Sequence, residues 1–209
     1  MIIAVDGPAA SGKGTIAKAL AAHYQLPHLD TGLLYRAVAL NLLRWGGDPS
    51  DEKEALAACD FSQIDFDDPE LKSEAAGGVA SRISVYPLVR AALIKRQRDF
   101  AEQPSGAVLD GRDIGTVIAP QAEAKLFVTA KADVRARRRH AELTKLGLQT
   151  HLEDVLLDIQ ARDERDRTRD MAPLQQAEDA DLLDTSEMAI DAAVQRAIAL
   201  VEARLGRGA

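Results

Sequence analysis

The chain has 209 residues, enough for one domain, or one domain with insertions, that buries a substantial core. Hydrophobic residues make up 46% of it and charged residues 28%, which is typical of a globular protein that folds in water. The net charge of −7 argues against a general nucleic-acid binder, because such domains are usually basic. Any anion site must therefore come from a local concentration of arginine.

The cysteine content and the lengths of the apolar runs indicate where in the cell the protein is located. Cys59 is the single cysteine, so no internal disulfide can form, and nothing basic flanks it. We interpret it as a small buried hydrophobe rather than a catalytic thiol. No apolar run approaches the ~20 residues that cross a bilayer, and the chain enters an apolar run at once without a basic leader. We expect a cytoplasmic protein, a monomer, that binds neither membranes nor nucleic acid.

A glycine-rich segment follows the apolar run 1–5 and precedes the helix-compatible stretch 16–21. It consists of Gly7, Pro8, Ala9, Ala10, Ser11, Gly12, Lys13, Gly14 and Thr15. Glycines let the backbone wrap around an anion with its N–H groups pointing inward, the helix N-terminus adds its dipole, and Lys13 adds a point charge. The segment therefore predicts a phosphate-binding loop that holds a nucleoside triphosphate.

The loop departs from its commonest form where magnesium would bind. Gly14 stands at the position where Ser or Thr normally offers a hydroxyl to the metal, and Thr15 follows it. We expect Mg²⁺ to be held mainly by phosphates and water. Thr15 and Asp110 are candidate oxygen ligands, acting through water.

Short apolar runs alternate with helical patterns along the chain. We predict strands at 2–5, 26–29, 107–109, 125–128 and 182–183, with helices ending near Tyr24 and Trp45 after the first two. The last helix has one apolar face, formed by Ile190, Val194, Ala197, Ile198, Val201 and Leu205. This alternation predicts a parallel sheet with helices on both faces.

Glycine and proline interrupt an acidic stretch between Gly46 and about Val85, which we interpret as an inserted subdomain. The predicted organisation is one domain, residues 1–209. Its core comprises about 1–46, 86–131 and 177–209, with an insertion at about 47–85 and an arginine-rich lid region at about 132–176.

Polar residues follow the second and third predicted strands, at the sheet edge where ligands of open α/β sheets bind. In segment 30–36, Thr31 is predicted to cap a helix and Arg36 to lie one turn inside it. In segment 110–116, Asp110 is placed to orient metal-bound water, with a turn or helix cap as the alternative. Arg112 and Asp113 follow it, and a local ion pair between them is the alternative to a functional role.

Arginines accumulate on the expected inward face of a helix near the C-terminal third. Leu152, Val155, Leu156 and Ile159 define a buried stripe that continues by steps of three and four to Arg162, Asp166 and Arg169. A solvated charged helix, the alternative, would carry its charges on the opposite side, as Arg167 does. The stripe favours a buried anion site.

A second helix repeats this conflict between charge and burial. Arg138 shares a face with Val134 and Ala141, and an arginine on such a face without structural partners suggests phosphate. The two helices flank Gly147, and Pro173 follows the second. The segment is therefore predicted to be a mobile lid that closes over the nucleotide.

The chain resembles the bacterial cytidylate kinases, a branch of the nucleoside monophosphate kinases, over essentially its whole length. The matching strings are 6–8 with 11–15, 30–32 with 35–36, Arg90 with 96–98, 110–113 with 115–116, and 162–169 with 172–174. The first is shared by many kinases, and the last two together are specific to this family. The resemblance implies a five-stranded parallel sheet with a monophosphate-binding insertion and a short lid. The implied reaction moves the terminal phosphoryl group of ATP to CMP or dCMP.

The resemblance also implies roles for particular residues. Ser81, Arg90 and Asp113 would hold the cytosine, Arg162 and Asp166 the sugar, and Arg36, Arg112 and Arg169 the phosphate; Thr31 would join them in binding the substrate. The implied catalytic residues are Lys13, Arg112, Arg138, Arg162 and Arg169. In one respect the chain departs from the family: residues 59–80 are shorter than its insertion and lack the strand pattern found there.

The chemistry of cytosine supports this reading independently. The base offers acceptors at its ring nitrogen and carbonyl and a donor at its amino group, so its reader needs Arg or Ser donors and a carboxylate acceptor. Two alternatives stay open from the sequence. One is another small phosphate-loop kinase, acting on a different monophosphate or on a metabolite such as shikimate or a coenzyme precursor. The other is a nucleotide-dependent switch or RNA-binding regulator that uses the arginine segments.

Overall fold

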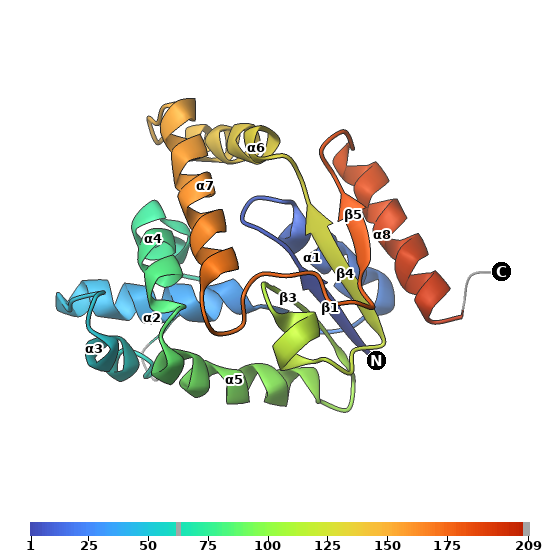
Figure 1. Cartoon of the computed structure of the whole chain (residues 1–209), viewed down its shortest axis with the longest axis horizontal. Helices are drawn as coiled ribbons and strands as arrows, with labels where there is room; N and C mark the ends of the chain where they lie inside the picture. The colour runs from blue at the N-terminus through green and yellow to red at the C-terminus, as the bar shows by residue number, and fades with distance from the viewer. Residues whose placement is uncertain (62–63, 207–209) are drawn as a thin grey trace. The chain divides into compact units, whose positions relative to one another are not determined.

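The computed structural model describes residues 1–61 and 64–206 (Figure 1). The chain divides into two compact units, Met1–His28 with Ala101–Ala209, and Leu29–Phe100. None of the helices in the described residues combines the length and the hydropathy needed to span a bilayer.

The sheet has five parallel strands in the described part of the chain, in the order β2-β3-β1-β4-β5. They are β1 (Ile2–Asp6), β2 (His28–Asp30), β3 (Ala107–Gly111), β4 (Ala124–Thr129) and β5 (Asp181–Asp184). The predicted α/β fold with a parallel sheet is confirmed, and the ends of all five strands lie within two residues of the prediction. β2 begins later than predicted, at His28. Pro27 precedes it and has no N–H to donate, although its carbonyl accepts from the Val108 N–H.

The central strand explains why the N-terminal run is uniformly apolar. β1 pairs with β3 on one side and β4 on the other, and Ile3, Ala4 and Val5 have no exposed surface. A strand covered on both faces reads as a continuous apolar run rather than an alternating one. The register places Asp6 of β1 opposite Gly111 of β3, so the chain segments that leave both strands start side by side.

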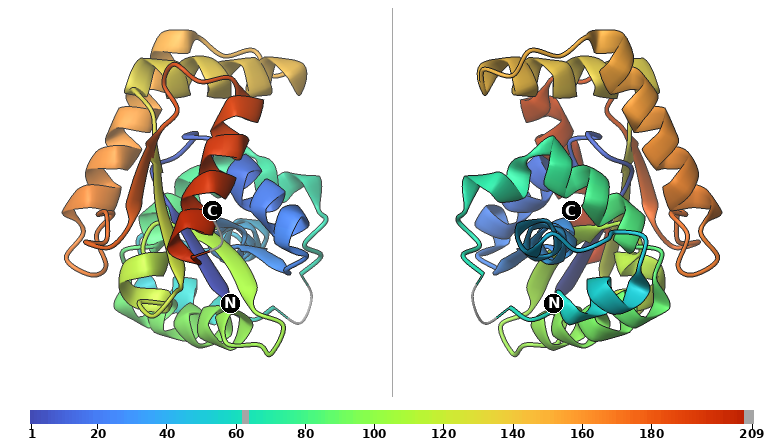
Figure 2. Two further views of the ribbon diagram at one scale, coloured as in Figure 1. Left: turned by 90° about the vertical axis from the view of Figure 1, so that its right-hand side faces the viewer. Right: turned by 90° about the vertical axis from the view of Figure 1, so that its left-hand side faces the viewer.

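Two helices of the first unit pack together against the sheet: α1 (Lys13–Tyr24) and α8 (Ile190–Arg204), blue and red in Figure 2. Ala197 and Val201 of the predicted apolar face are buried, and Val194, Ile198 and Leu205 pack partly buried against the same core. Ala193, which the prediction left out, is buried as well. Ile190 is 49% exposed, so its place in that face was wrong. It is the first residue of the helix and lines the pocket described below.

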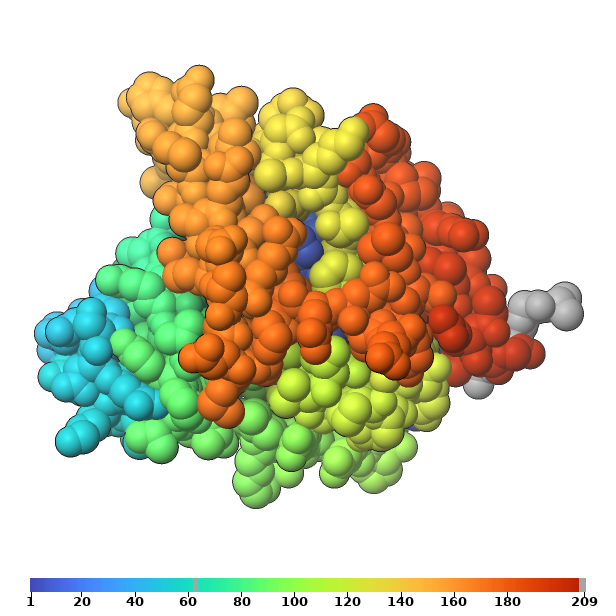
Figure 3. Space-filling model, in the orientation of Figure 1, coloured from blue at the N-terminus to red at the C-terminus, as the bar shows by residue number. Residues whose placement is uncertain are grey.

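The other two helices of this unit, α6 (Ala132–Lys145) and α7 (Leu152–Thr168), lie side by side (yellow and orange, Figure 3). Ala136, Leu143, Val155 and Ile159 form a small core between them. Leu152, predicted to start the buried stripe of α7, is 39% exposed because it is the first residue of the helix and lies beyond this core. A π-helical turn, η2 (Ile114–Ile118), follows β3.

Apart from the last two residues of β2, the regular secondary structure of the second unit is helical in the described residues. It contains α2 (Thr31–Trp45), α3 (Glu52–Ala57), the 3₁₀ turn η1 (Pro69–Lys72), α4 (Glu74–Ile83) and most of α5 (Pro87–Ala101). Its core joins α2 and α4 through buried residues that include Leu34, Val38, Val79 and Ile83. Cys59 packs partly buried against this core, and burial raises the pKa of its thiol to about 11. That environment fits a small apolar residue and not a nucleophile.

The start of α2 corrects one prediction. Asp30, not Thr31, is the N-cap: its Oδ1 accepts from the Gly32 N–H at 2.9 Å, and Thr31 is the first helical residue. Aspartate is the better capping residue because its carboxylate also interacts favourably with the helix dipole. Thr31 itself is buried.

Candidate active site

The phosphate loop connects β1 to α1 with a backbone that only small residues allow. Gly7 has φ +155°, and a Cβ there would lie 2.0 Å from the Val128 carbonyl oxygen. Gly12 has φ +90° and is the N-cap of α1, with no side-chain hydrogen bond to the first turn. The N–H groups that begin α1 are thus left without a side-chain cap. A helix N-terminus of this kind is an anion site.

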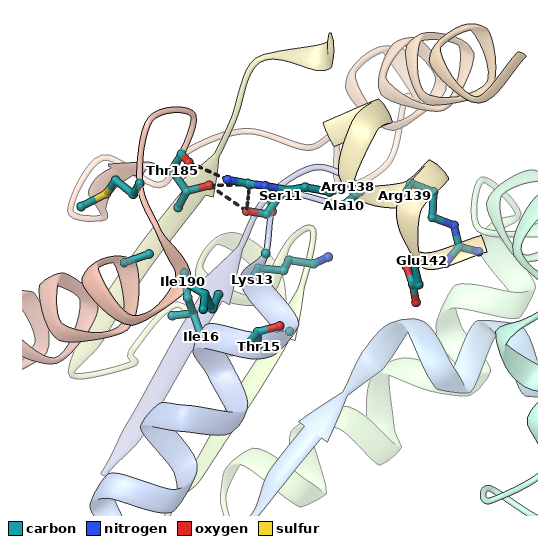
Figure 4. Close-up of a pocket in the computed structure, with 14 residues that line it drawn as sticks. Ala10, Ser11, Lys13, Thr15, Ile16, Arg138, Arg139, Glu142, Thr185 and Ile190 are labelled. Carbon is teal, nitrogen blue, oxygen red and sulfur yellow. Dashed lines mark hydrogen bonds and ion pairs between the residues drawn. The ribbon is translucent and has the colours of Figure 1, made fainter. Parts of the chain in front are cut away.

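A pocket of about 460 Å³ adjoins this loop, within the range of small-molecule sites (Figure 4). The lining residues are Ala10, Ser11, Gly12, Lys13, Gly14, Thr15, Ile16, Arg138, Arg139, Glu142, Thr185, Met188, Ile190 and Ala193. The pocket thus combines the phosphate loop, the arginines of α6 and apolar side chains at the start of α8. Charged and apolar walls together suit a nucleotide, which has phosphates at one end and a base at the other.

Arg138 is held beside the loop by a short network of hydrogen bonds. Its guanidinium donates to Thr185 Oγ1 at 2.9 Å, to the Thr185 carbonyl at 2.7 Å and to the Ser11 carbonyl at 3.5 Å (Figure 4). The buried Thr185 hydroxyl also lies 3.0 Å from the Ser11 carbonyl. The prediction that Arg138 lacks structural partners was wrong. The buried face of α6 runs through Arg135, Ala136 and Leu143 instead.

Asp110, at the end of β3, lies against the start of α1. A Cβ on Gly14 would be 3.8 Å from Asp110 Oδ2, an ordinary van der Waals distance, so this carboxylate lies beside the first turn of α1. The other oxygen, Oδ1, is 2.7 Å from His28 Nε2. Asp110 is 1% exposed. It therefore lies next to the phosphate loop, and it is not a cap of η2, whose N-cap is Asp113.

Beyond β3, arginine and carboxylate side chains alternate in a network. Arg112 Nε donates to Asp166 Oδ2 of α7 at 2.8 Å, and Arg169 Nη2 donates to Asp113 Oδ1 at 3.4 Å. Arg112 and Asp113 are therefore not simply a local ion pair with each other, because Arg112 pairs with Asp166 and Asp113 with Arg169, in a distant part of the chain. We call Arg112, Asp113, Asp166 and Arg169 the acceptor network.

The electrostatics of Asp166 reflect this arrangement. Burial raises the pKa of its carboxyl, but Arg112, Arg162 and Arg169 outweigh burial, and the net pKa lies below its usual value. The group is therefore ionised at neutral pH. The charges at the C-terminal end of α7 face inward, as the stripe predicted: Asp166 is 4% exposed and Arg169 is 8% exposed, while Arg167 is exposed.

The prediction of a buried stripe along α7 was wrong in one detail. α7 ends at Thr168, and Arg169 is its C-cap with extended backbone (φ −62°, ψ 138°), so helical spacing does not account for its position. Its burial follows from tertiary contacts: Nε donates to the Ala172 carbonyl at 2.6 Å and Nη2 to Asp113. Ala172 has φ +50°, which turns the chain back toward this arginine.

Besides Thr31, the second unit contains the predicted site residues Arg36, Ser81 and Arg90. Arg36 Nη1 donates to the carbonyls of Leu71 and Ser73, and a Cβ on Gly77 would lie 2.8 Å from its Nη2. Ser81 is a buried residue of α4. Arg90, of α5, is 2% exposed and lies within 3.4 Å of both the Tyr35 hydroxyl and the Ser84 carbonyl.

Comparison with known proteins decides the family. The model of the family described as cytidylate kinase matches residues 3–203 of this chain. The chain belongs to the cytidylate kinase family. It is 57% identical to the cytidylate kinase of Rhodopseudomonas palustris (strain BisA53), over 99% of both chains. It is 56% identical to that of Nitrobacter winogradskyi (strain Nb-255), over 97% of this chain and 96% of the relative. The resemblance stated from the motifs is confirmed.

Cytidylate kinase activity, the phosphorylation of CMP and dCMP, is thus the activity of this enzyme, a nucleotide-binding transferase. Solved structures of lower identity agree in fold alone. An uncharacterized protein from Eubacterium ventriosum aligns with a TM-score of 0.58 at 15% identity, covering 97% of this chain and 98% of that one. A gluconokinase from Sinorhizobium meliloti aligns with a TM-score of 0.54 at 16% identity, covering 98% and 92%.

Several residues of this cytidylate kinase that join its elements were not predicted from the sequence. Arg135 and Asp163 form a buried bidentate ion pair between α6 and α7, with Nη1 to Oδ1 at 3.0 Å and Nη2 to Oδ2 at 2.5 Å. Arg135 also donates to the Ala9 carbonyl in the phosphate loop at 3.2 Å. His28 and Thr185 were missed as well. One usable signal was that Asp163 lies four residues beyond Ile159 on the buried face of α7.

Proposed function

We propose that this cytidylate kinase takes its phosphoryl group from ATP bound at the loop Gly7–Thr15. The observation that carries the proposal is the loop itself, with Lys13 and the uncapped start of α1 beside a pocket of about 460 Å³. Lys13 would neutralise charge on the transferring phosphoryl group. Arg138, held by Thr185 and Ser11, is placed to do the same from the side of α6.

The acceptor network of Arg112, Asp113, Asp166 and Arg169 would bind CMP. A carboxylate such as Asp113 can accept from the exocyclic amino group of cytosine, whereas uracil presents a carbonyl at that position. We assign the phosphate to Arg112 and Arg169 and the sugar to Asp166 with Arg162. Because Arg112 and Arg169 already pair with carboxylates, a bound phosphate would share or replace those partners.

Residues of the second unit keep the roles that the family resemblance implies. Ser81 and Arg90 would contact the cytosine, Arg36 the phosphate, and Thr31 the substrate. A guanidinium carries five N–H donors, the chemistry that suits a phosphate, and Nη1 of Arg36 donates to the carbonyls of Leu71 and Ser73. We also retain the assignment of residues 47–85 as the monophosphate-binding insertion and of 132–176 as a lid.

The residues near the loop fit a magnesium ion that ATP brings with it. Thr15 and Asp110 supply hydroxyl and carboxylate oxygens, the donors that Mg²⁺ prefers, and Asp110 Oδ2 lies close to Gly14. The described residues contain no group of three or more His, Cys, Asp or Glu that could hold a metal. Mg²⁺ typically keeps several waters and binds through one or two carboxylates plus substrate phosphates. When bound, it would neutralise charge on the phosphate oxygens.

Catalysis by these residues is a matter of position and charge. An oxygen of the CMP phosphate, already ionised at neutral pH, attacks the terminal phosphorus of ATP, and the bond to the bridging oxygen breaks to leave ADP. No general base is needed, and the cations Lys13, Arg112, Arg138, Arg162 and Arg169 would stabilise the charge that spreads over the transferring group. The cytoplasm, where ATP and CMP are available, remains the proposed location, and a monomer the proposed state.

A coupled assay of ADP formation with each nucleoside monophosphate at equal concentration tests the proposal. We expect CMP and dCMP to be strongly preferred over UMP, because a mismatched contact at the base costs about 1–3 kcal/mol. Asp113→Asn should narrow the gap between CMP and UMP. A wild-type enzyme that used UMP as efficiently as CMP, or an Asp113→Asn variant with unchanged preference, would refute the assigned role of Asp113.

A further inference from the structure

A buried carboxylate joins the strand before the phosphate loop to the acceptor network. Asp6 ends β1, directly before Gly7, and is 5% exposed. Its Oδ1 accepts from the Ile114 N–H and its Oδ2 from the Gly115 N–H, both at 2.8 Å. These two N–H groups follow directly after Arg112 and Asp113 in the chain.

The two hydrogen bonds fix the turn that orients Asp113. The carbonyl of Asp113 accepts from the N–H groups of Val117 and Ile118, at 2.9 and 3.2 Å, so its backbone is part of η2. Asp6 holds the first two residues of that turn from the other side. A Cβ on Gly115 would lie 3.4 Å from Asp6 Oδ2 and 3.1 Å from Lys125 Cδ, so the turn packs closely on the carboxylate.

We propose that Asp6 is a positioning residue that ties the cytosine-reading loop, residues 112–115, to the strand that leads into the phosphate loop. Each oxygen of the carboxylate serves one N–H, an arrangement that an amide cannot reproduce because one of its two polar atoms is a donor. The inference rests on the proposed role of Asp113. It assigns to Asp6 no contact with either substrate.

The ionisation of Asp6 gives the proposal a second readout. Burial raises the pKa of this carboxyl to about 7, against the opposing effect of the two N–H groups; Asp113 raises it further and Arg112 lowers it. Lys125 of β4 packs on the same turn, and its Nζ donates to the Pro120 carbonyl and to Asp179. Protonation below about pH 7 converts one acceptor oxygen of Asp6 into a hydroxyl, and the loop loses part of its anchor.

The test compares Asp6→Asn with the wild-type enzyme and with Glu123→Gln. Glu123 also accepts from a backbone N–H group, that of Ile2 at 2.6 Å, but its side chain is exposed and lies outside the proposed sites. We expect Asp6→Asn to lower kcat/KM for CMP about tenfold or more and to reduce the CMP preference over UMP, because one buried N–H loses its acceptor. The KM for ATP should change less than about threefold, and Glu123→Gln should leave all three quantities unchanged.

Further measurements distinguish positioning from a general structural role. Hydrogen exchange at the Ile114 and Gly115 amides should accelerate in Asp6→Asn. The CMP preference of the wild type should rise from pH 6 to pH 8, and that rise should be absent in the variant, whereas the titration of the CMP phosphate is common to both. Should Asp6→Asn fail to fold, Gly115→Ala, which crowds the same contact while keeping the carboxylate, should shift the CMP preference in the same direction to a smaller extent.

Equal losses for ATP and CMP, or unchanged exchange at the two amides, would overturn the proposal. Unchanged CMP preference in Asp6→Asn alongside reduced preference in Asp113→Asn would also overturn it while leaving the proposed function intact. Unchanged preference in Asp113→Asn would instead refute the assigned role of Asp113, and the amide exchange would still report whether Asp6 anchors the turn.

Discussion

The phosphate loop and the acceptor network, which we propose to bind the two nucleotides, are built to hold an anion by different means. The loop does it with nine consecutive residues, a helix N-terminus and one lysine, and its shape is dictated by glycines such as Gly7, where no Cβ fits. The network uses side chains from segments more than fifty residues apart, and its arginines already carry carboxylate partners. In the proposed function the loop is therefore a site of backbone geometry, whereas the arginines of the network would share or replace their carboxylate partners when substrate binds.

The largest effect should follow from removing the charge of the loop. We expect Lys13→Met to lower turnover by about 10³-fold or more in a protein that stays folded, the scale of a preorganised cation in a dry site. Steady-state kinetics measure the loss of turnover, and thermal denaturation shows whether the variant stays folded. Activity close to the wild-type level in the folded variant would remove the phosphate-loop assignment.

Removing an arginine from the acceptor network should lower turnover to a comparable extent, and the effect should be on kcat rather than on KM. We expect Arg169→Ala to lower turnover by about 10³-fold, as arginines supplied to phosphoryl transfer do, with a much smaller rise in the KM for CMP. Arg167, exposed and two residues earlier, is the control, and its alanine variant should lose little. Equal losses at the two positions under saturating ATP would show that burial does not identify the catalytic arginine.

The ion pair that joins the two helices beside the loop should matter for stability more than for chemistry. Asp163→Ala leaves Arg135 buried without its partner, and we expect a loss of about 3 kcal/mol in the free energy of unfolding. Asp133→Ala breaks the exposed pair with Arg137 and should cost less than about 0.5 kcal/mol. Denaturant titration of both variants measures the difference, and similar small losses would mean that the buried pair is not a structural link.

The smallest effect concerns Asp6 and has a defined sign. Its pKa rises from 3.8 in the unfolded chain to about 7 in the folded protein, so between these values the folded state binds the extra proton. The free energy of unfolding should therefore fall as pH rises from 5 to 7, by about 2 kcal/mol from this group alone. Asp6→Asn should lack this contribution. Identical pH dependence of stability in the two proteins would show that Asp6 does not titrate in this range.

The sequence predicted the fold and the loop because their signals are local. Apolar runs, helix periodicity and the spacing of glycines are readable within a few residues, and the five strands and α1 follow from them. Hydrogen bonds between single side chains and groups far away in the sequence have no such local signal. Asp6 with Ile114, and His28 with Asp110, lie more than eighty residues apart, and nothing in the local pattern of either member indicates the other. The prediction that Arg169 is buried was correct, but it assumed that helix α7 continues through this residue, and α7 ends at Thr168.

Equilibrium binding of ATP and of CMP, each to Lys13→Met and to Asp113→Asn, tests the separation of the two sites most directly. By isothermal titration calorimetry we expect Lys13→Met to bind CMP as the wild type does while ATP affinity falls, and Asp113→Asn to bind ATP normally while CMP affinity falls by about tenfold or more. Parallel losses of both ligands in both variants would contradict the division between a backbone site for the donor and a side-chain network for the acceptor.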